Sequence, residues 1–189
     1  MKHVVVTTIN APTPAVLKIA AGAASHGWRV VLIGDSKSPP DYALDGAEYL
    51  DLSGQHATGF HFARLAPTGH YARKNVGYLV SIRNGAELIL ETDDDNIPID
   101  GFWTDLPLRQ PASVIRGNGW TNIYAYFADF VVWPRGLPLD RIHVPPPAFS
   151  DLPLEVVDCP VQQGLADDNP DVDAIYRLVL PLPVKFKRS

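Results

Sequence analysis

The first third of the chain alternates between strand-like and helix-like patterns, and this alternation limits the folds that the sequence can adopt. Residues 4–9 and 29–33 are mostly β-branched or aliphatic, which is typical of strands buried on both faces of a parallel sheet. Between them, residues 15–26 place apolar side chains on one helical face, and Gly27 follows as a C-cap. The pattern predicts a βαβ unit.

Further elements extend this unit. Residues 48–52 and 87–92 are predicted as a third and a fourth strand, and residues 71–84 as a helix. Residues 53–68 show no clear period. The expected fold class is α/β, with an open and mostly parallel sheet, flanking helices and a Rossmann-like, nucleotide-binding front half.

The second half of the chain differs, because most of the 18 prolines follow residue 97. Helical periods fade there, and residues 113–116 and 130–133 are predicted as short strands between loops. We expect a single domain over residues 1–189, with a nucleotide-binding half over 1–98 and a loop-rich half over 99–189.

Composition excludes several classes of protein. Sixteen Lys and Arg residues against 21 Asp and Glu give a formal net charge of −5, and no basic stripe is visible, so a nucleic-acid partner is not expected. Cys159 is the single cysteine, which excludes an internal disulfide and fits a reducing compartment. No secretory signal or bilayer-long apolar run is found, so we expect a cytoplasmic protein without a membrane span.

The strongest chemical signal is the acidic triplet Asp93, Asp94 and Asp95, directly after the fourth predicted strand. Adjacent carboxylates repel one another unless a positive charge lies among them. Ligands of open α/β sheets bind at the carboxyl ends of strands, and alternation along an extended chain places Asp93 and Asp95 on one side. Hard oxygen ligands select Mg²⁺ or Mn²⁺, which can bridge the oxygens of a diphosphate.

Other interpretations compete with this metal site. An exposed turn or helix start is the simplest of them. A calcium loop fails, because Ile97 and Pro98 occupy the fifth and sixth positions of the required pattern. An aspartyl-phosphate hydrolase would use Asp93 as its nucleophile, but its motif usually follows the first strand of the domain and continues with Thr or Val, not Asn96.

Further candidate residues lie at the ends of the first two strands and at the start of the helix over 71–84. They are Thr7, Thr8, Asn10, Asp35, Ser36, Lys37, Arg73, Lys74 and Asn75. Thr, Asn and Asp can hydrogen-bond a base or a ribose, and cations at a helix start suit an anion. Each residue alone is equally well explained as an ordinary cap or an exposed first turn.

Several familiar motifs are absent from the sequence. No G-x-G-x-x-G fingerprint follows the first strand and no P-loop is present, which disfavours dinucleotide and P-loop chemistry. The histidine spacing does not suit zinc, and Cys159 is interpreted as structural. Trp103 and Trp120 lie downstream of the triplet, where a sugar could stack, although tryptophans are more often core residues.

Several long motifs resemble the STELLO-type glycosyltransferase-like family and cover most of the chain in order. They are GDSK at 34–37, RKNVGYL at 73–79, ILETDDDNIP at 89–98, WPRGLPL at 133–139 and QQGLADDNPDVDAIYRL at 162–178. A more distant resemblance is to the reversibly glycosylated polypeptides. Those proteins act as nucleotide-arabinose mutases and also carry an acidic triplet after a strand.

The resemblance implies a GT-A fold and a nucleotide-diphosphate-sugar donor, for which we expect a UDP-sugar with Mn²⁺ or Mg²⁺. It implies that the triplet is the DxD element, with Asp95 as the direct metal ligand and Asp93 both a ligand and near the ribose. Asp94 is counted among the donor contacts, and Thr8, Asp35 and Lys74 become further ones.

The expected function is metal-dependent glycosyl transfer to an acceptor that is a glycan, a lipid or a protein. An inverting reaction needs a carboxylate base near the acceptor, and Asp168, Asp171 and Asp173 in the acceptor-side half are the candidates. A retaining reaction needs no base there. A nucleotide-sugar mutase and a non-catalytic nucleotide-sugar-binding or interaction protein are the alternatives.

Two expectations concern the whole chain. The sequence ends soon after residues 171–173, where we expect relatives to continue with acceptor contacts or a further metal ligand. The proline-rich half leaves room for an interface between two copies, so a homo-oligomer is also considered.

Overall fold

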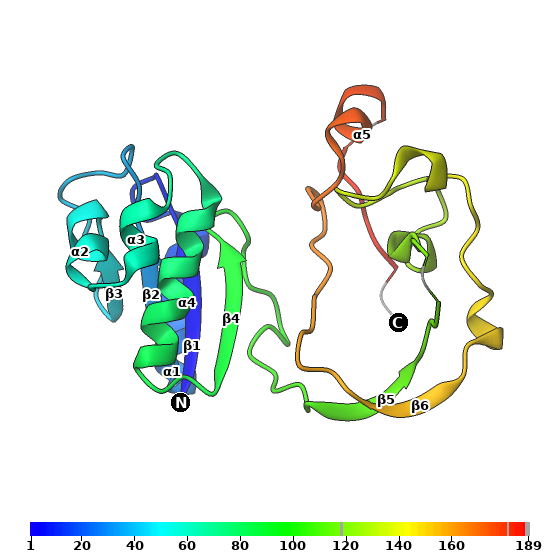
Figure 1. Ribbon diagram of the computed structural model, residues 1–189, viewed down its shortest axis with the longest axis horizontal. Coiled ribbons are helices and arrows are strands. Elements are labelled where there is room, and N and C mark those ends of the chain that lie inside the picture. The colour runs from blue at the N-terminus through cyan, green and yellow to red at the C-terminus, as the bar shows by residue number, and fades with distance from the viewer. Residues whose placement is uncertain (118, 181, 188–189) are drawn as a thin grey trace. The chain divides into compact units, whose positions relative to one another are not determined.

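A parallel sheet of four strands lies at the centre of the first part of the chain (Figure 1). The computed structural model describes residues 1–117, 119–180 and 182–187. The remaining four residues are outside the described residues. The chain divides into two compact units, Met1–Thr104 and Asp105–Ser189. The expectation of one functional domain stays a prediction.

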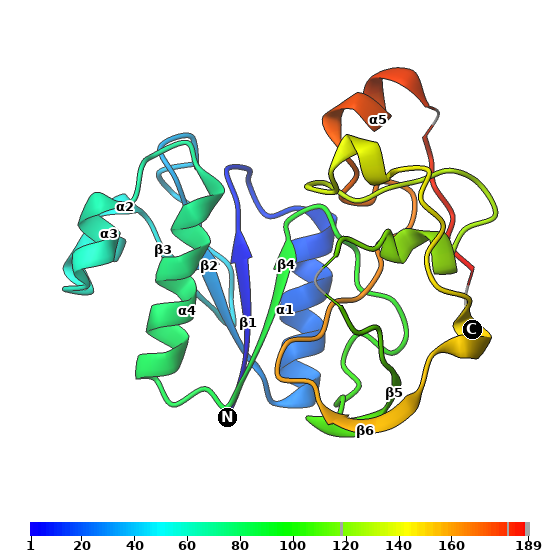
Figure 2. The ribbon, with the colours of Figure 1, turned by 45° about the vertical axis from the view of Figure 1, so that its right-hand side comes forward.

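The first unit contains β1 (Lys2–Thr7), α1 (Pro14–His26), β2 (Arg29–Ile33), β3 (Ala47–Leu50), α2 (Leu52–Ala57), α3 (His61–Leu65), η1 (Tyr71–Arg73), α4 (Lys74–Arg83) and β4 (Leu88–Asp93). The strands lie side by side in the order β3-β2-β1-β4, and every pair is parallel (Figure 2). The expected fold class is confirmed: this is an open α/β sheet flanked by helices, consistent with a GT-A-like fold.

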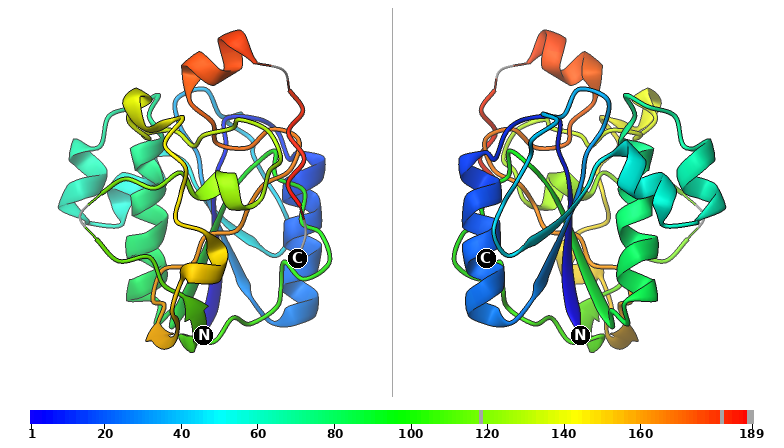
Figure 3. Two further views of the ribbon diagram at one scale, coloured as in Figure 1. Left: turned by 90° about the vertical axis from the view of Figure 1, so that its right-hand side faces the viewer. Right: turned by 90° about the vertical axis from the view of Figure 1, so that its left-hand side faces the viewer.

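Helices cover both faces of the sheet, which Figure 3 shows nearly edge-on. Because side chains alternate along a strand, Val4 and Val6 of β1 face α1, whereas Val5 faces α4. Two separate cores result. The core beneath α1 contains Val4, Val6, Val16, Ile19, Ala23, Trp28, Val30, Leu32 and Tyr42. The core beneath α3 and α4 contains Val5, Val31, Ile33, Ala63, Val76 and Val80.

Helix α1 begins and ends at residues with clear local reasons. The hydroxyl oxygen of Thr13 accepts a hydrogen bond from the backbone N–H of Val16 at 3.2 Å, and Pro14 occupies the first helical position. Gly27 ends the helix with φ of 70°, a left-handed conformation that favours glycine. Trp103 packs on this helix, where it stacks on His26 and meets the edge of Trp28, so it is a packing residue.

Residues 53–68, for which the sequence shows no period, form the short helices α2 and α3. Helix α2 has six residues and α3 has five, which is too short for an apolar stripe to repeat. The local signal for α2 is Asp51, whose Oδ1 accepts a hydrogen bond from the backbone N–H of Gly54 at 2.6 Å.

The second unit is rich in loops. Its elements are β5 (Arg109–Ser113), η2 (Ile123–Tyr126), η3 (Leu139–Arg141), η4 (Phe149–Asp151), β6 (Leu154–Asp158) and α5 (Ala174–Val179). Strands β5 and β6 form an antiparallel ribbon. A separate core gathers Tyr124, Val132, Trp133, Leu137, Val172, Tyr176, Val184 and Phe186.

Two strand predictions in this unit are wrong. The strand expected at 113–116 lies earlier, at β5, and only Ser113 belongs to it. Residues 130–133, all of them described, form no strand. Val132 and Trp133 are buried in the core instead, and the carbonyl of Val132 accepts a hydrogen bond from Asn122 Nδ2 at 2.8 Å. A side chain thus replaces the neighbouring strand that this backbone would otherwise need.

None of the helices in the described ranges is both long enough and apolar enough to cross a membrane.

Candidate functional site

The order of the strands reverses between β1 and β4. The chain passes from β1 to β2 and β3 on one side, and then returns to add β4 on the other side of β1. Such a switch point opens a crevice at the carboxyl ends of the two strands, where α/β proteins bind ligands. Thr7 and Asp93 are paired at these ends. The residues that follow them therefore lie at the crevice.

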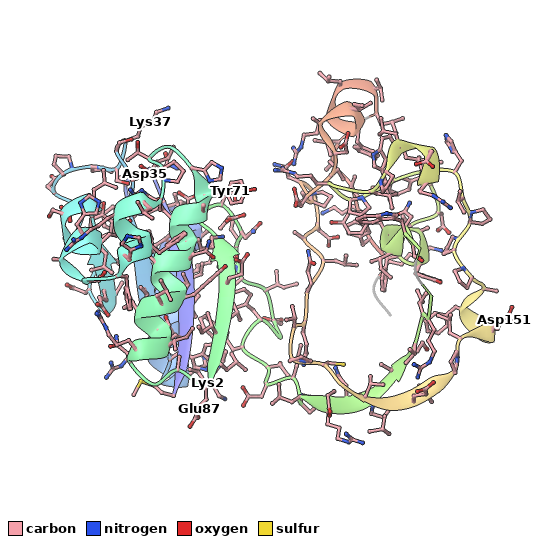
Figure 4. The ribbon with its side chains drawn as sticks, in the orientation of Figure 1. Lys2, Asp35, Lys37, Tyr71, Glu87 and Asp151 are labelled. Carbon is pink, nitrogen blue, oxygen red and sulfur yellow. The ribbon has the colours of Figure 1, made fainter. Side chains whose placement is uncertain are left out.

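A cavity of about 380 Å³ lies at this end of the sheet, a volume within the usual range of ligand sites. It is lined by Thr7, Thr8, Ile9, Ile33, Gly34, Asp35, Ser36, Lys37, Gly69, His70, Tyr71, Arg73, Asp93, Asp94 and Asp95. Figure 4 shows Asp35, Lys37 and Tyr71 at one end of the first unit, and Lys2 and Glu87 at the other. Most predicted donor contacts and both predicted metal ligands thus line one cavity.

Lys74 balances the first carboxylate of the triplet. Its Nζ lies 2.6 Å from Asp93 Oδ1 and 3.6 Å from Glu91 Oε1, and it donates to the carbonyl of Thr92 at 3.2 Å. Lys74 is only 8% exposed, so these oxygens replace the water that its ammonium group loses. The contact occupies one oxygen of Asp93, and a carboxylate has two.

The middle carboxylate joins the two strand ends. Asp94 Oδ2 accepts hydrogen bonds from Thr8 Oγ1 at 2.6 Å and from Asn10 Nδ2 at 3.0 Å. The backbone carbonyl of Asp94 accepts a further bond from Thr13 Oγ1, the N-cap of α1. These bonds span the switch point and fix the loop after β1 against the turn after β4. The donor contact expected for Asp94 stays a prediction.

Asp95 differs from its two neighbours. Strand β4 ends at Asp93, and Asp94 and Asp95 lie in a turn, so strand alternation does not set the direction of the Asp95 side chain. Asp95 is exposed and lines the cavity. Within the part of the chain that the structure describes, its carboxylate takes part in no salt bridge or hydrogen bond.

Arg73 is a wall residue, and only 3% of it is exposed. Its Nη1 donates to Gln55 Oε1 at 2.7 Å and its Nη2 to the carbonyl of Ala66 at 2.8 Å. Gln55, which is fully buried, donates in turn to the carbonyls of Gly34 at 2.7 Å and Leu50 at 2.9 Å. The pair ties α2 and α3 to the end of β2. The sequence analysis missed Gln55, because it lies in the segment without a period.

Asp35 fixes the segment that leads into η1. Its Oδ2 accepts hydrogen bonds from the backbone N–H groups of Gly69 at 2.8 Å and His70 at 3.3 Å, and its Oδ1 accepts from Ser36 at 2.6 Å. Burial acts to raise the pKa of Asp35, but these donors and the nearby Arg73 cation outweigh it. The pKa therefore lies below its ordinary value of 3.8, and Asp35 is ionised at neutral pH.

The remaining candidates surround this framework. Lys37 is exposed in the cavity wall, whereas Asn75 is exposed on α4 outside the lining set. Ser38, which the sequence analysis did not identify, donates to the carbonyl of Thr8 at 2.7 Å and accepts from the Asp35 N–H at 2.8 Å. It connects the loops after β1 and β2.

The three candidate bases belong to the second unit, where each has a partner. Asp168 Oδ1 lies 2.5 Å from Lys185 Nζ, and Asp171 Oδ1 lies 2.8 Å from Arg135 Nη2. Asp173 caps α5 by accepting a hydrogen bond from the Ile175 N–H at 2.8 Å. Their role as bases stays a prediction.

The acidic triplet does not form a complete metal-binding cluster from protein side chains of the described residues alone. Across residues 1–117, 119–180 and 182–187, no three or more His, Cys, Asp or Glu side chains are grouped so that they could hold a metal ion. Mg²⁺ and Mn²⁺ at phosphate sites need fewer, because one or two carboxylates share the ion with phosphate oxygens and water. Asp93 and Asp95, which line the cavity, fit that smaller set.

Comparison with known proteins supports the expected family. No protein-family model matches the chain. Two curated relatives from Arabidopsis thaliana, named probable glycosyltransferase STELLO1 and probable glycosyltransferase STELLO2, are each 32% identical to it over 190 residues. Each match covers 93% of this chain and 24% of the relative. The resemblance to the STELLO-type family is thus confirmed, and the chain spans about a quarter of the length of the curated relatives it matches.

Proposed function

We propose that the chain binds the donor of a glycosyl-transfer reaction, a nucleotide-diphosphate sugar, with a divalent cation in the cavity at the switch point. The observation that carries the proposal is the placement of the acidic triplet. Asp93 and Asp95 line a cavity of about 380 Å³ at the carboxyl end of β4, with a buried lysine beside them. The names of the two relatives support the same reaction class.

The residues of the cavity have distinct roles in this proposal. Asp93 and Asp95 would hold a Mn²⁺ or Mg²⁺ ion, since one or two carboxylates suffice for such an ion at a phosphate site. When bound, such an ion would neutralise negative charge on the departing nucleoside diphosphate. Lys74 adds a fixed positive charge next to Asp93, which lessens the repulsion between the triplet and an anionic donor.

The transfer itself breaks the bond between the anomeric carbon of the sugar and the oxygen of the diphosphate. The acceptor hydroxyl forms the new bond to that carbon and loses its proton. In an inverting reaction a carboxylate accepts this proton, and Asp168, Asp171 and Asp173 remain the candidates. In this proposal the donor is a UDP-sugar, and the acceptor is a glycan, a lipid or a protein.

Thermal unfolding with a panel of nucleotides tests donor binding. UDP, GDP, ADP, CDP and UDP-sugars are added with and without Mn²⁺, and at least one is expected to raise the melting temperature when Mn²⁺ is present. The Asp93→Asn/Asp95→Asn variant should fold and lose this shift. The matched control is Asp41→Asn/Asp45→Asn, which removes two exposed carboxylates outside the cavity lining.

The outcomes separate the related functions. Donor binding that persists unchanged in Asp93→Asn/Asp95→Asn would count against the metal site. Mass spectrometry of the bound or released sugar distinguishes transfer to an acceptor from the altered ring that a nucleotide-sugar mutase would produce. A chain that binds the donor but leaves the sugar unchanged with every acceptor offered would be a non-catalytic binding protein.

A further inference from the structure

The cavity wall carries one large aromatic side chain that faces solvent. Tyr71, the first residue of η1, lines the cavity and is 76% exposed. A tyrosine side chain combines a large apolar ring with a polar hydroxyl, which suits it to contacts with a ligand. Tyr71 belongs to neither of the two cores of the first unit. Its ring is therefore accessible to a ligand that enters the cavity.

Tyr71 stacks on His70, with ring centroids 4.7 Å apart and an interplanar angle of 23°. His70 is itself held in place by two hydrogen bonds. Its Nδ1 accepts from the backbone N–H of Ala72 at 3.0 Å, and its backbone N–H donates to Asp35 Oδ2 at 3.3 Å. One face of the tyrosine ring is thus supported by a fixed neighbour. The exposed fraction of the residue indicates that the opposite face is open.

The backbone N–H of His70 donates to Asp35, which follows β2, whereas the triplet begins at the end of β4. Two strand spacings separate β2 from β4 in the sheet, which is roughly 10 Å. Both groups line the same cavity. An extended ligand with a flat aromatic ring at one end and a diphosphate at the other matches this arrangement. Asp35 and Lys37 line the same cavity, and Figure 4 shows them with Tyr71 at one end of the first unit. They offer an acceptor and a donor for the polar edge of such a ring.

We propose that Tyr71 is the stacking platform for the nucleobase of the donor, with His70 supporting the far side of its ring. The inference rests on the proposed function and names the residue that recognises the base rather than the phosphates. Stacking between a base and an aromatic ring tolerates different bases, so base selection falls to the polar residues around it.

Isothermal titration of the full chain with Mn²⁺ tests this assignment with two probes, pyrophosphate and the nucleoside diphosphate that binds best. Tyr71→Ala should weaken binding of the nucleoside diphosphate by about 10- to 100-fold, because base stacking on an aromatic ring has that value. Tyr71→Phe and Tyr71→Trp keep a flat ring and should retain the affinity. Pyrophosphate should bind all four proteins equally.

Phe62→Ala is the matched control, because Phe62 is an exposed aromatic residue outside the cavity lining. It should change neither affinity. Unchanged binding of the nucleoside diphosphate to Tyr71→Ala would overturn the inference while the proposed function stands. An equal loss for pyrophosphate would also overturn it, since Tyr71 would then only shape the cavity. If no nucleoside diphosphate binds the unaltered chain, the proposed function fails and the inference fails with it.

Discussion

Asp93, Asp94 and Asp95 are adjacent in the sequence but lie in three different environments. Asp93 is paired with the buried Lys74, and Asp94 accepts a hydrogen bond from the hydroxyl of Thr8. Asp95 is exposed and makes no hydrogen bond or ion pair with the described residues. Three neighbouring carboxylates repel one another, and a cation or hydrogen-bond donor next to one of them reduces that repulsion. Single substitutions at 94 and 95 should therefore separate a structural role from a binding role.

The first prediction compares Asp94→Ala with Asp95→Ala. Asp94→Ala removes the nearer acceptor of the hydroxyl of Thr8, a residue that is 3% exposed, and leaves only the more distant Asn10 carbonyl at 3.3 Å. The free energy of unfolding should therefore fall by about 1–3 kcal/mol. Asp95→Ala removes an exposed charge beside two like charges, so the free energy of unfolding should change by no more than about 0.5 kcal/mol. Urea denaturation without divalent ions, followed by tryptophan fluorescence, measures both values.

Asp94→Asn is the control for this comparison. It keeps an oxygen that can accept from Thr8 and should recover most of the stability lost in Asp94→Ala. Asp95→Ala is expected to lose the binding of Mn²⁺ and nucleotide, although its stability is unchanged. Equal losses of stability at the two positions would refute the separate roles.

The position of the triplet could be predicted, but the roles of its members could not. A strand followed by three aspartates is visible in a short stretch of sequence. The partners of Asp94 are not, because Thr8 and Asn10 are separated from it by 86 and 84 residues. Local patterns report conformation, whereas such contacts arise from the parallel pairing of β1 and β4. Gln55 could not be identified for a different reason, because it lies in a segment without a period.

At the scale of elements, helix α4 faces the sheet with a glycine that leaves no room for a side chain. A Cβ atom on Gly77 would be 2.5 Å from Val5 Cγ1 and 3.0 Å from Ile33 Cγ1. Both contacts are with strand residues of a core that contains Val76 and Val80 of the same helix. The absence of a side chain at 77 therefore allows α4 to pack against β1 and β2. That packing positions Arg73 and Lys74 beside the cavity.

The second prediction concerns Gly77→Ala. Alanine favours a helix over glycine by about 1 kcal/mol, but the added methyl group must displace buried neighbours, which typically costs about 1–3 kcal/mol. With Cβ contacts this short, we expect a net loss in the free energy of unfolding, on the order of 1 kcal/mol. Urea denaturation measures it. Ile82→Ala, an exposed position on the same helix, should remain within about 0.5 kcal/mol of the unaltered chain. A more stable Gly77→Ala variant would contradict the close packing.

Periodicity predicted the elements that are long or buried on both faces. The strands β1, β2 and β4 and helix α1 lie within two residues of their predicted bounds. Helices α2 and α3 depend on a cap and on a buried glutamine, which produce no repeating pattern. Residues 130–133 have the composition of a strand, but Val132 and Trp133 are buried in the core of the second unit without pairing with any strand of the described residues. Burial alone therefore does not distinguish a strand from a buried loop.

For the whole molecule, the proposed donor site and the candidate bases belong to different units of the chain. Every residue that lines the cavity precedes Asn96, and both cores of the first unit lie before Thr104. The candidate bases and a third core lie in the second unit. The first unit contains both its own cores and the whole cavity lining, so it should bind the donor without the second unit.

The third prediction is therefore that a fragment of residues 1–104 folds and binds the donor. Circular dichroism should show cooperative unfolding, because Trp103 completes the core beneath α1 within this range. Mn²⁺ with the best nucleotide at 100 times its Kd adds about 2.7 kcal/mol of stability, a rise in melting temperature on the order of 10 °C for a domain of this size. Glycosyl transfer should be absent from the fragment. A folded fragment without this shift would show that donor binding needs residues after 104, and the division of labour would be wrong.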